Sequence, residues 1–128
     1  MGLLNRVALL NKEELKIEKV DLGGGDFVYV RQMTARERDR WEQSLLREKR
    51  DRGRAITFES AMEDFRAKLA VHTVCDEHGK NLLEQSDYEM LSQNMSAARL
   101  ELIINRSQEL NKISAEDREA LVKNSEGD

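Results

Sequence analysis

The spacing of apolar and polar residues changes its period once, near residue 33, and this change divides the chain into two kinds of structure. Before it, residues 15–20 and 27–31 alternate between apolar and polar side chains, which is typical of strands. The glycine-rich segment 21–26 lies between them, so the pattern predicts a β-hairpin over residues 15–31. After it, apolar residues recur at helical spacing. We therefore predict a mainly α, α+β fold in which about five helices over residues 34–124 follow a small N-terminal β-hairpin.

Capping residues predict where these helices begin. Thr34 stands at the change of period and Glu37 follows three residues later. In such a capping box, each side chain accepts a hydrogen bond from the backbone amide of the other residue. The same spacing recurs at Ser86 with Glu89 and at Ser114 with Asp117, and single caps are predicted at Thr57 and Ser96. Gly53 is a candidate left-handed cap at the end of the first long helix.

The length of 128 residues predicts a single domain over residues 1–128. The pattern over residues 1–14 predicts a short N-terminal helix that is loosely held to the rest of the domain. Leu3, Val7 and Leu10 would share one face of this helix. Residues 125–128 are expected to be flexible as well. The most apolar helix is expected to run from Thr57 to about Cys75 and to form the centre of the core.

Composition narrows the possible functions. Charged residues make up 36% of the chain, its net charge is −4, and no apolar run approaches the roughly 20 residues that span a bilayer. We therefore expect a well-solvated protein without a membrane partner. The stretch Arg31–Arg54 holds nine basic and five acidic residues, so it is the one candidate nucleic-acid surface. Because the acidic residues are interleaved, a solvated, salt-bridged helix face is the favoured interpretation.

Candidate catalytic and metal-binding residues are few. His72, Cys75 and His78 are spaced three apart, but structural zinc normally requires four ligands, and a fourth would have to be Asp76 or Glu77. A thiol near a helix C-terminus is also a poor nucleophile. The three glycines at 23–25 are not followed by the lysine and hydroxyl residue of a phosphate-binding loop. We therefore predict no enzymatic activity, no cofactor and no metal, and the single cysteine excludes an internal disulfide.

Two stretches resemble a known family. The first is Val30–Glu42, Val-Arg-Gln-Met-Thr-Ala-Arg-Glu-Arg-Asp-Arg-Trp-Glu. The second runs from Arg66 to Asn124 and contains Asp-Glu-His-Gly-Lys at 76–80, paired alanines at 97–98, Leu-Asn at 110–111 and a terminal Lys-Asn at 123–124. In content and order these pieces are similar to the tail assembly chaperones of long-tailed bacteriophages, over roughly residues 26–124.

The resemblance implies a non-enzymatic function. Members of this family bind the long tape measure protein and keep it soluble until tail tube subunits polymerise around it. It implies a location in the host cytoplasm and absence from the mature virion. In many relatives a programmed −1 frameshift adds a domain that recruits the tail tube protein, and this chain would be the shorter, unshifted product. The family offers no catalytic residues to transfer.

A chaperone for a long helical chain needs grooves that accept helices, and several copies along the target. We hypothesise that partner binding or self-association uses the first long helix or a later one, through Trp41, Leu45, Leu46, Ile103 and Ile104. For Trp41, packing in the core is the favoured alternative, because tryptophan is usually highly buried. The rival function is that of a small helical nucleic-acid-binding or regulatory protein that uses Arg31–Arg54.

Overall fold

The computed structural model describes the backbone of residues 2–52 and 58–126, and the side chains of residues 2–45 and 65–123. Within these ranges, six helices and a three-stranded antiparallel sheet confirm the predicted helix-dominated α+β class. The elements in chain order are α1 (Arg6–Leu10), β1 (Ile17–Gly23), β2 (Asp26–Arg31), α2 (Ala35–Arg52), α3 (Phe58–Thr73), β3 (Val74–Cys75), the 3₁₀ turn η1 (Gln85–Asp87), α4 (Tyr88–Asn94), α5 (Ala97–Leu110) and α6 (Ala115–Glu126).

The predicted hairpin is present, but its strands are shifted along the chain. β1 starts at Ile17 instead of residue 15 and continues to Gly23, where it pairs with Asp26 after a bulge. The turn is therefore shorter than the predicted segment 21–26. Gly24 and Gly25 form its tip with φ of +63° and +86°, a conformation that side chains other than glycine rarely adopt.

Arg99 on α5 fastens the tip of this hairpin to the helical body. Its guanidinium donates hydrogen bonds to the carbonyl oxygens of Leu22 and Gly23, each at 3.2 Å, and to a carboxylate oxygen of Asp26 at 2.8 Å. A strand pair alone is marginally stable in water, so this contact holds the hairpin against α5.

The predicted helix over residues 57–75 ends two residues early. Val74 and Cys75 leave the helix and pair with Val30 and Tyr29 as strand β3, and Cys75 also bridges to Asn81. The physical reason is that β2 would otherwise present unpaired backbone groups next to the buried side chain of Val30. The helical periodicity of the side chains continues past Thr73 and conceals this change.

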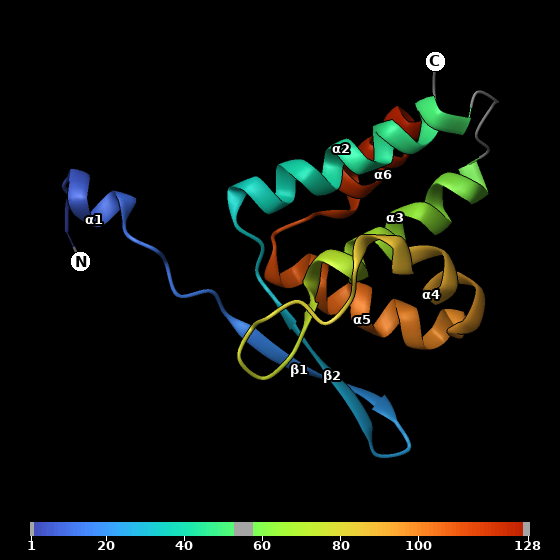
Figure 1. The fold of residues 1–128 in the computed structure, drawn as a ribbon, viewed down its shortest axis with the longest axis horizontal. Helices are drawn as coiled ribbons and strands as arrows, with labels where there is room; N and C mark the ends of the chain where they lie inside the picture. Colours follow the sequence, from blue (N-terminus) through green and yellow to red (C-terminus); the bar gives the residue numbers. More distant parts are fainter. Residues whose placement is uncertain (1, 53–57, 127–128) are drawn as a thin grey trace.

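Figure 1 shows α3 between two pairs of helices, α2 with α6 on one side and α4 with α5 on the other. The rings of Trp41 on α2 and Phe65 on α3 meet edge to face with centroids 5.3 Å apart, and both side chains are fully buried. The favoured expectation that Trp41 packs in the core is therefore confirmed. Ile103, Ile104 and Val122 complete the centre of this core from α5 and α6.

Three predicted caps are confirmed. The Thr34 hydroxyl accepts from the Glu37 amide at 3.2 Å, and the Glu37 carboxylate accepts from the Thr34 amide at 2.8 Å. Ser114 and Asp117 repeat this arrangement at the start of α6, at 3.0 and 3.1 Å. Ser96 caps α5 by accepting from the Arg99 amide at 3.2 Å.

The predicted box at Ser86 and Glu89 is wrong. The chain turns two residues earlier, in η1, where the Asp87 carboxylate accepts from the Glu84 amide at 2.8 Å. Because η1 runs directly into α4, Ser86 already lies inside the turn and does not precede the helix. The predicted caps at Gly53 and Thr57 lie outside the described residues.

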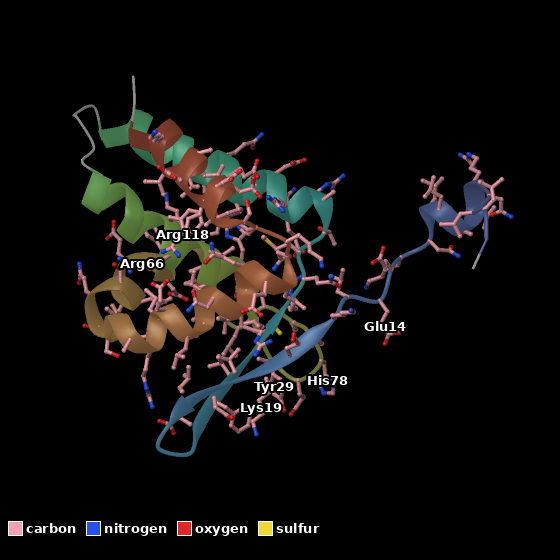
Figure 2. The ribbon with its side chains drawn as sticks, turned by 180° about the vertical axis from the view of Figure 1, so that it is seen from behind. Glu14, Lys19, Tyr29, Arg66, His78 and Arg118 are labelled. Atoms are coloured by element: carbon pink, nitrogen blue, oxygen red, sulfur yellow. The ribbon has the colours of Figure 1, made fainter. Side chains whose placement is uncertain are left out.

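A charged cluster joins α3, α5 and α6. Glu101 accepts hydrogen bonds from Arg66 and Arg118, each at 3.1 Å, and Figure 2 shows these two arginines reaching toward each other. Arg118 also lies over the ring of Phe65, 5.1 Å from its centroid. Burial raises the pKa of Glu101, but the hydrogen bonds from Arg118 and Arg66 outweigh it and hold this pKa below its usual range.

Residues 2–14 form an arm that stands apart from the body, with α1 near its end (Figure 1). Every side chain of this arm is exposed. Asn5 caps α1 by accepting from the Ala8 amide at 2.9 Å. In the part of the chain that the structure describes, no helix has the length and apolar character needed to cross a membrane.

Candidate interaction surfaces

Four of the five residues predicted to bind a partner lie in the core instead of on the surface. Trp41 and Ile104 are fully buried, Ile103 is 1% exposed and Leu45 is 2% exposed. The side chain of Leu46 falls outside the described residues. A partner contacts only what the folded chain exposes, so this placement argues against a docking role for the four described residues. Helical periodicity identifies the apolar face of a helix, but it does not tell whether the core of the same chain or a partner covers that face.

The basic stretch Arg31–Arg54 starts with a buried structural arginine. Arg31 is 5% exposed and binds both carboxylate oxygens of Glu37, at 2.9 and 2.6 Å. It also donates to the Asn81 side chain at 2.6 Å and to the Gln32 carbonyl at 3.0 Å. The hydrogen bond from Arg31 lowers the pKa of Glu37 to about 2, and the same bond raises the pKa of Arg31. Arg31 therefore joins the sheet to the start of α2.

Arg38 is also used within the fold. It donates to Glu42 at 3.3 Å and to the carbonyl of Asn111 at 3.0 Å. Arg36 and Arg40 are exposed, with the exposed Asp39 between them. Over residues 31–45, where the side chains are described, the stretch thus alternates in charge and does not form a continuous basic surface.

The structure does not bring His72, Cys75 and His78 together. His72 is buried, with its Nδ1 2.9 Å from the Lys68 carbonyl and its Nε2 3.3 Å from the Gln85 amide nitrogen. Burial lowers the pKa of His72 and raises the pKa of Cys75, which disfavours both a charged imidazole and a thiolate. His78 is exposed in the turn after β3 (Figure 2). Among the described residues, no group of three or more His, Cys, Asp or Glu side chains is placed to hold a metal ion.

The segment Asp-Glu-His-Gly-Lys at 76–80 forms a tight turn. The Asp76 carboxylate accepts from the amides of His78 at 2.8 Å and Lys80 at 3.0 Å, and these bonds lower the pKa of Asp76. Gly79 has φ of +84°, and a Cβ at this position would lie 3.0 Å from the Ile17 side chain. The turn therefore requires both the acidic residue and the glycine for structural reasons.

Asn111 has a comparable structural role at the end of α5. Its side-chain oxygen accepts from the Met33 amide at 2.7 Å, and its amide group donates to the Arg31 carbonyl at 3.3 Å and to the Ser107 carbonyl at 2.9 Å. It thereby satisfies the backbone where β2 turns into α2. Asp76, Gly79 and Asn111 therefore each have a structural role at a turn or junction of the fold.

Two apolar surfaces remain uncovered in the described chain, and the first is the arm. Its large apolar side chains are between 61% and 102% exposed, namely Leu3, Leu4, Val7, Leu9 and Leu10. Of the three residues predicted to share one helical face, Val7 and Leu10 lie on α1, whereas Leu3 precedes the helix. The exposure of all of them is the feature that the sequence pattern alone does not reveal.

The second surface is a groove at α4 with a volume of about 380 Å³, which we call the α4 groove. It is lined by Leu83, Asp87, Met90, Leu91, Asn94 and Met95. Leu83, Leu91 and Met95 are partly buried against the core, whereas Met90 is 67% exposed. Sequence reasoning missed this groove, since the only signal was three apolar residues within the short helical segment that follows residue 87.

Comparisons with protein-family models, with curated proteins and with solved structures find no match for this chain.

Proposed function

We propose that this chain is a non-enzymatic tail assembly chaperone of a long-tailed bacteriophage. It binds the tape measure protein and keeps this protein soluble while the tail tube assembles around it. It acts in the host cytoplasm and is absent from the finished virion, and a frameshifted longer form would recruit the tail tube protein.

The observation that supports this function is the order of the motifs along the chain. A strand and a capped helix at 30–42 are followed by the turn at 76–80, the paired alanines at 97–98 and the Leu-Asn and Lys-Asn pairs. Several of these residues have a structural role that depends on their identity. Glu37 pairs with Arg31, Asp76 closes a turn, and Asn111 links α5 to β2. A sequence that preserved this fold would therefore preserve these residues in this order.

The exposed apolar surfaces also support a binding function. A tape measure protein is a long, largely helical chain, and its apolar stripes aggregate unless another surface covers them. The arm and the α4 groove offer apolar surface outside the core, and methionine side chains such as Met90 and Met95 adapt to targets of irregular shape. The nucleic-acid alternative has less support, because Arg31 and Arg38 are already engaged within the fold.

Co-expression with the long helical protein encoded just downstream tests this function. We expect that protein to be insoluble alone, and to be soluble and to co-purify when this chain is present. Absorbance at 260 and 280 nm before and after a high-salt wash tests the alternative, since nucleic acid bound through phosphates is released by salt. If the target protein stays insoluble and the purified chain instead carries salt-sensitive nucleic acid, the chaperone function is refuted.

A pair of variants shows whether the apolar surface carries the binding. Met90→Asp places a charge in the α4 groove, and Leu102→Asp places the same charge on α5 at a residue that is 46% exposed and does not line the groove. We expect the first variant to reduce the soluble yield of the target and the second to leave it unchanged. Equal yields from both would show that the groove has no part in holding the target.

A further inference from the structure

We infer that the apolar arm of one copy of this chain docks in the α4 groove of a second copy. This inference concerns the chain on its own and does not depend on which protein it chaperones. It rests on three observations. The apolar side chains of the arm are not covered by the body, the α4 groove is apolar as well, and the arm lies too far from the groove of its own copy to dock there.

The arm is incomplete by itself. α1 has five residues, whereas an isolated helix in water needs about 12–15 residues to be even marginally stable. No residue of α1 is buried, and the apolar side chains Val7, Leu9 and Leu10 of this helix are 67% to 68% exposed. A short helix of this composition becomes stable when its apolar side packs against another surface.

The α4 groove matches the arm in size and chemistry. Its volume of about 380 Å³ accepts a few aliphatic side chains, and its floor is made of leucine and methionine. The charges are complementary as well. In the apolar part of the arm, residues 2–12, the charged residues are Arg6 and Lys12, whereas Glu13 and Glu14 lie at the base of the arm. The groove has Asp87 in its lining, and the exposed Glu84 and Glu89 lie within three residues of it in the chain.

The position of the arm favours a second copy as the occupant. α1 and α4 lie at opposite ends of the long axis of the molecule (Figure 1). The linker 11–16 spans only about 20 Å when fully extended, and β1 anchors its end in the sheet. An arm that points away from its own body reaches the groove of another copy without rearrangement of the hairpin. Such a head-to-tail contact leaves one arm and one groove free at the ends, so association continues as concentration rises.

Sedimentation velocity on the purified full-length chain tests this inference. We expect the wild type to be monomeric when dilute and to form dimers and larger species as it is concentrated. The association is weak, on the order of micromolar, because the contact is small. Two variants each remove one half of the contact: Val7→Asp with Leu10→Asp in the arm, and Met90→Asp in the groove. Each weakens association about tenfold or more, because an unpaired carboxylate is poorly tolerated in an apolar pocket.

Mixing the two variants provides the decisive comparison. The arm variant retains an intact groove and the groove variant retains an intact arm, so their equimolar mixture forms a heterodimer and stops at two copies. Formation of this dimer also shows that both variants are folded. Leu102→Asp is the matched control and associates like the wild type.

Three results would overturn the inference. One is a wild type that stays monomeric at every concentration, which would leave the groove to another protein or to the chain's own arm. Another is a mixture of the two variants that stays monomeric although each has the wild-type unfolding midpoint. The third is association of both variants with wild-type strength, which would place the contact between copies elsewhere.

Discussion

The pairing of Arg31 with Glu37 makes a testable contribution to stability. Glu37 has an ordinary pKa of 4.5, which Arg31 and the Thr34 amide lower to about 2 in the folded chain. One pKa unit corresponds to about 1.4 kcal/mol, so the charged carboxylate contributes about 3 kcal/mol at neutral pH. The variant Glu37→Gln is expected to lose an amount of this size, because it also leaves the buried Arg31 charge without its partner.

The sign of the pH dependence follows from the direction of this shift. A lowered pKa stabilises the folded state above the unfolded pKa, near 4.5, and the contribution disappears as the pH falls toward about 2. At pH 3 about 2 of the 3 kcal/mol are already lost, since the unfolded carboxylate is then protonated. The difference in unfolding free energy between wild type and Glu37→Gln should therefore shrink strongly between pH 7 and pH 3.

Urea unfolding at both pH values measures this difference. Glu42→Gln is a matched control on the same helix. Its pair with Arg38 is partly exposed and spaced i,i+4, so it is worth about 0.3–0.5 kcal/mol. Adding Arg31→Met to Glu37→Gln should cause no further loss, because the double variant has no unpaired buried charge. A difference between wild type and Glu37→Gln that is equally large at pH 7 and pH 3 would refute this account of the pair.

Three further predictions concern the core, a cap and the arm. Trp41→Ala should lower the unfolding free energy by about 3–5 kcal/mol in urea titrations, since it empties a fully buried site against Phe65. Ser114→Ala should cost about 1 kcal/mol in the same assay, because the Asp117 amide loses its acceptor. Deletion of residues 2–11 should leave the unfolding midpoint of dilute protein unchanged, since none of them is buried, while it abolishes the concentration-dependent association seen by sedimentation.

The features that the sequence predicted correctly depend on contacts between near neighbours in the chain. Thr34 with Glu37 and Ser114 with Asp117 are separated by three residues, so both partners are visible within one helical turn. Apolar residues that recur every two residues likewise indicate a strand, and apolar residues that recur about every 3.6 residues indicate a helix, without knowledge of the fold. The hairpin, the start of α2 and the helical class were therefore predictable.

The errors arose where a distant segment decides the local structure. Val74 and Cys75 continue an apolar helical stripe, but β2 captures them as a strand by pairing with Tyr29 and Val30, more than forty residues earlier in the chain. The burial of Trp41 was hidden from the sequence in the same way, because the aromatic ring that covers it, Phe65, comes from α3. Arg31 looked like part of a basic surface, and only the fold shows that it is buried in an ion pair.

The small core explains why the exposed apolar residues point to function. Aromatic residues make up 5% of the chain and charged residues 36%, so ion pairs and caps secure many of the junctions between elements. Among the residues that the structure describes, none of these ion pairs joins the arm to the body, and the exposed leucines and valine of the arm add nothing to the stability of the body. Exposed apolar side chains also promote aggregation, so a sequence under no other demand would replace them with polar residues. Their apolar character is explained when another surface covers them, and the arm and the α4 groove are therefore where binding is to be tested first.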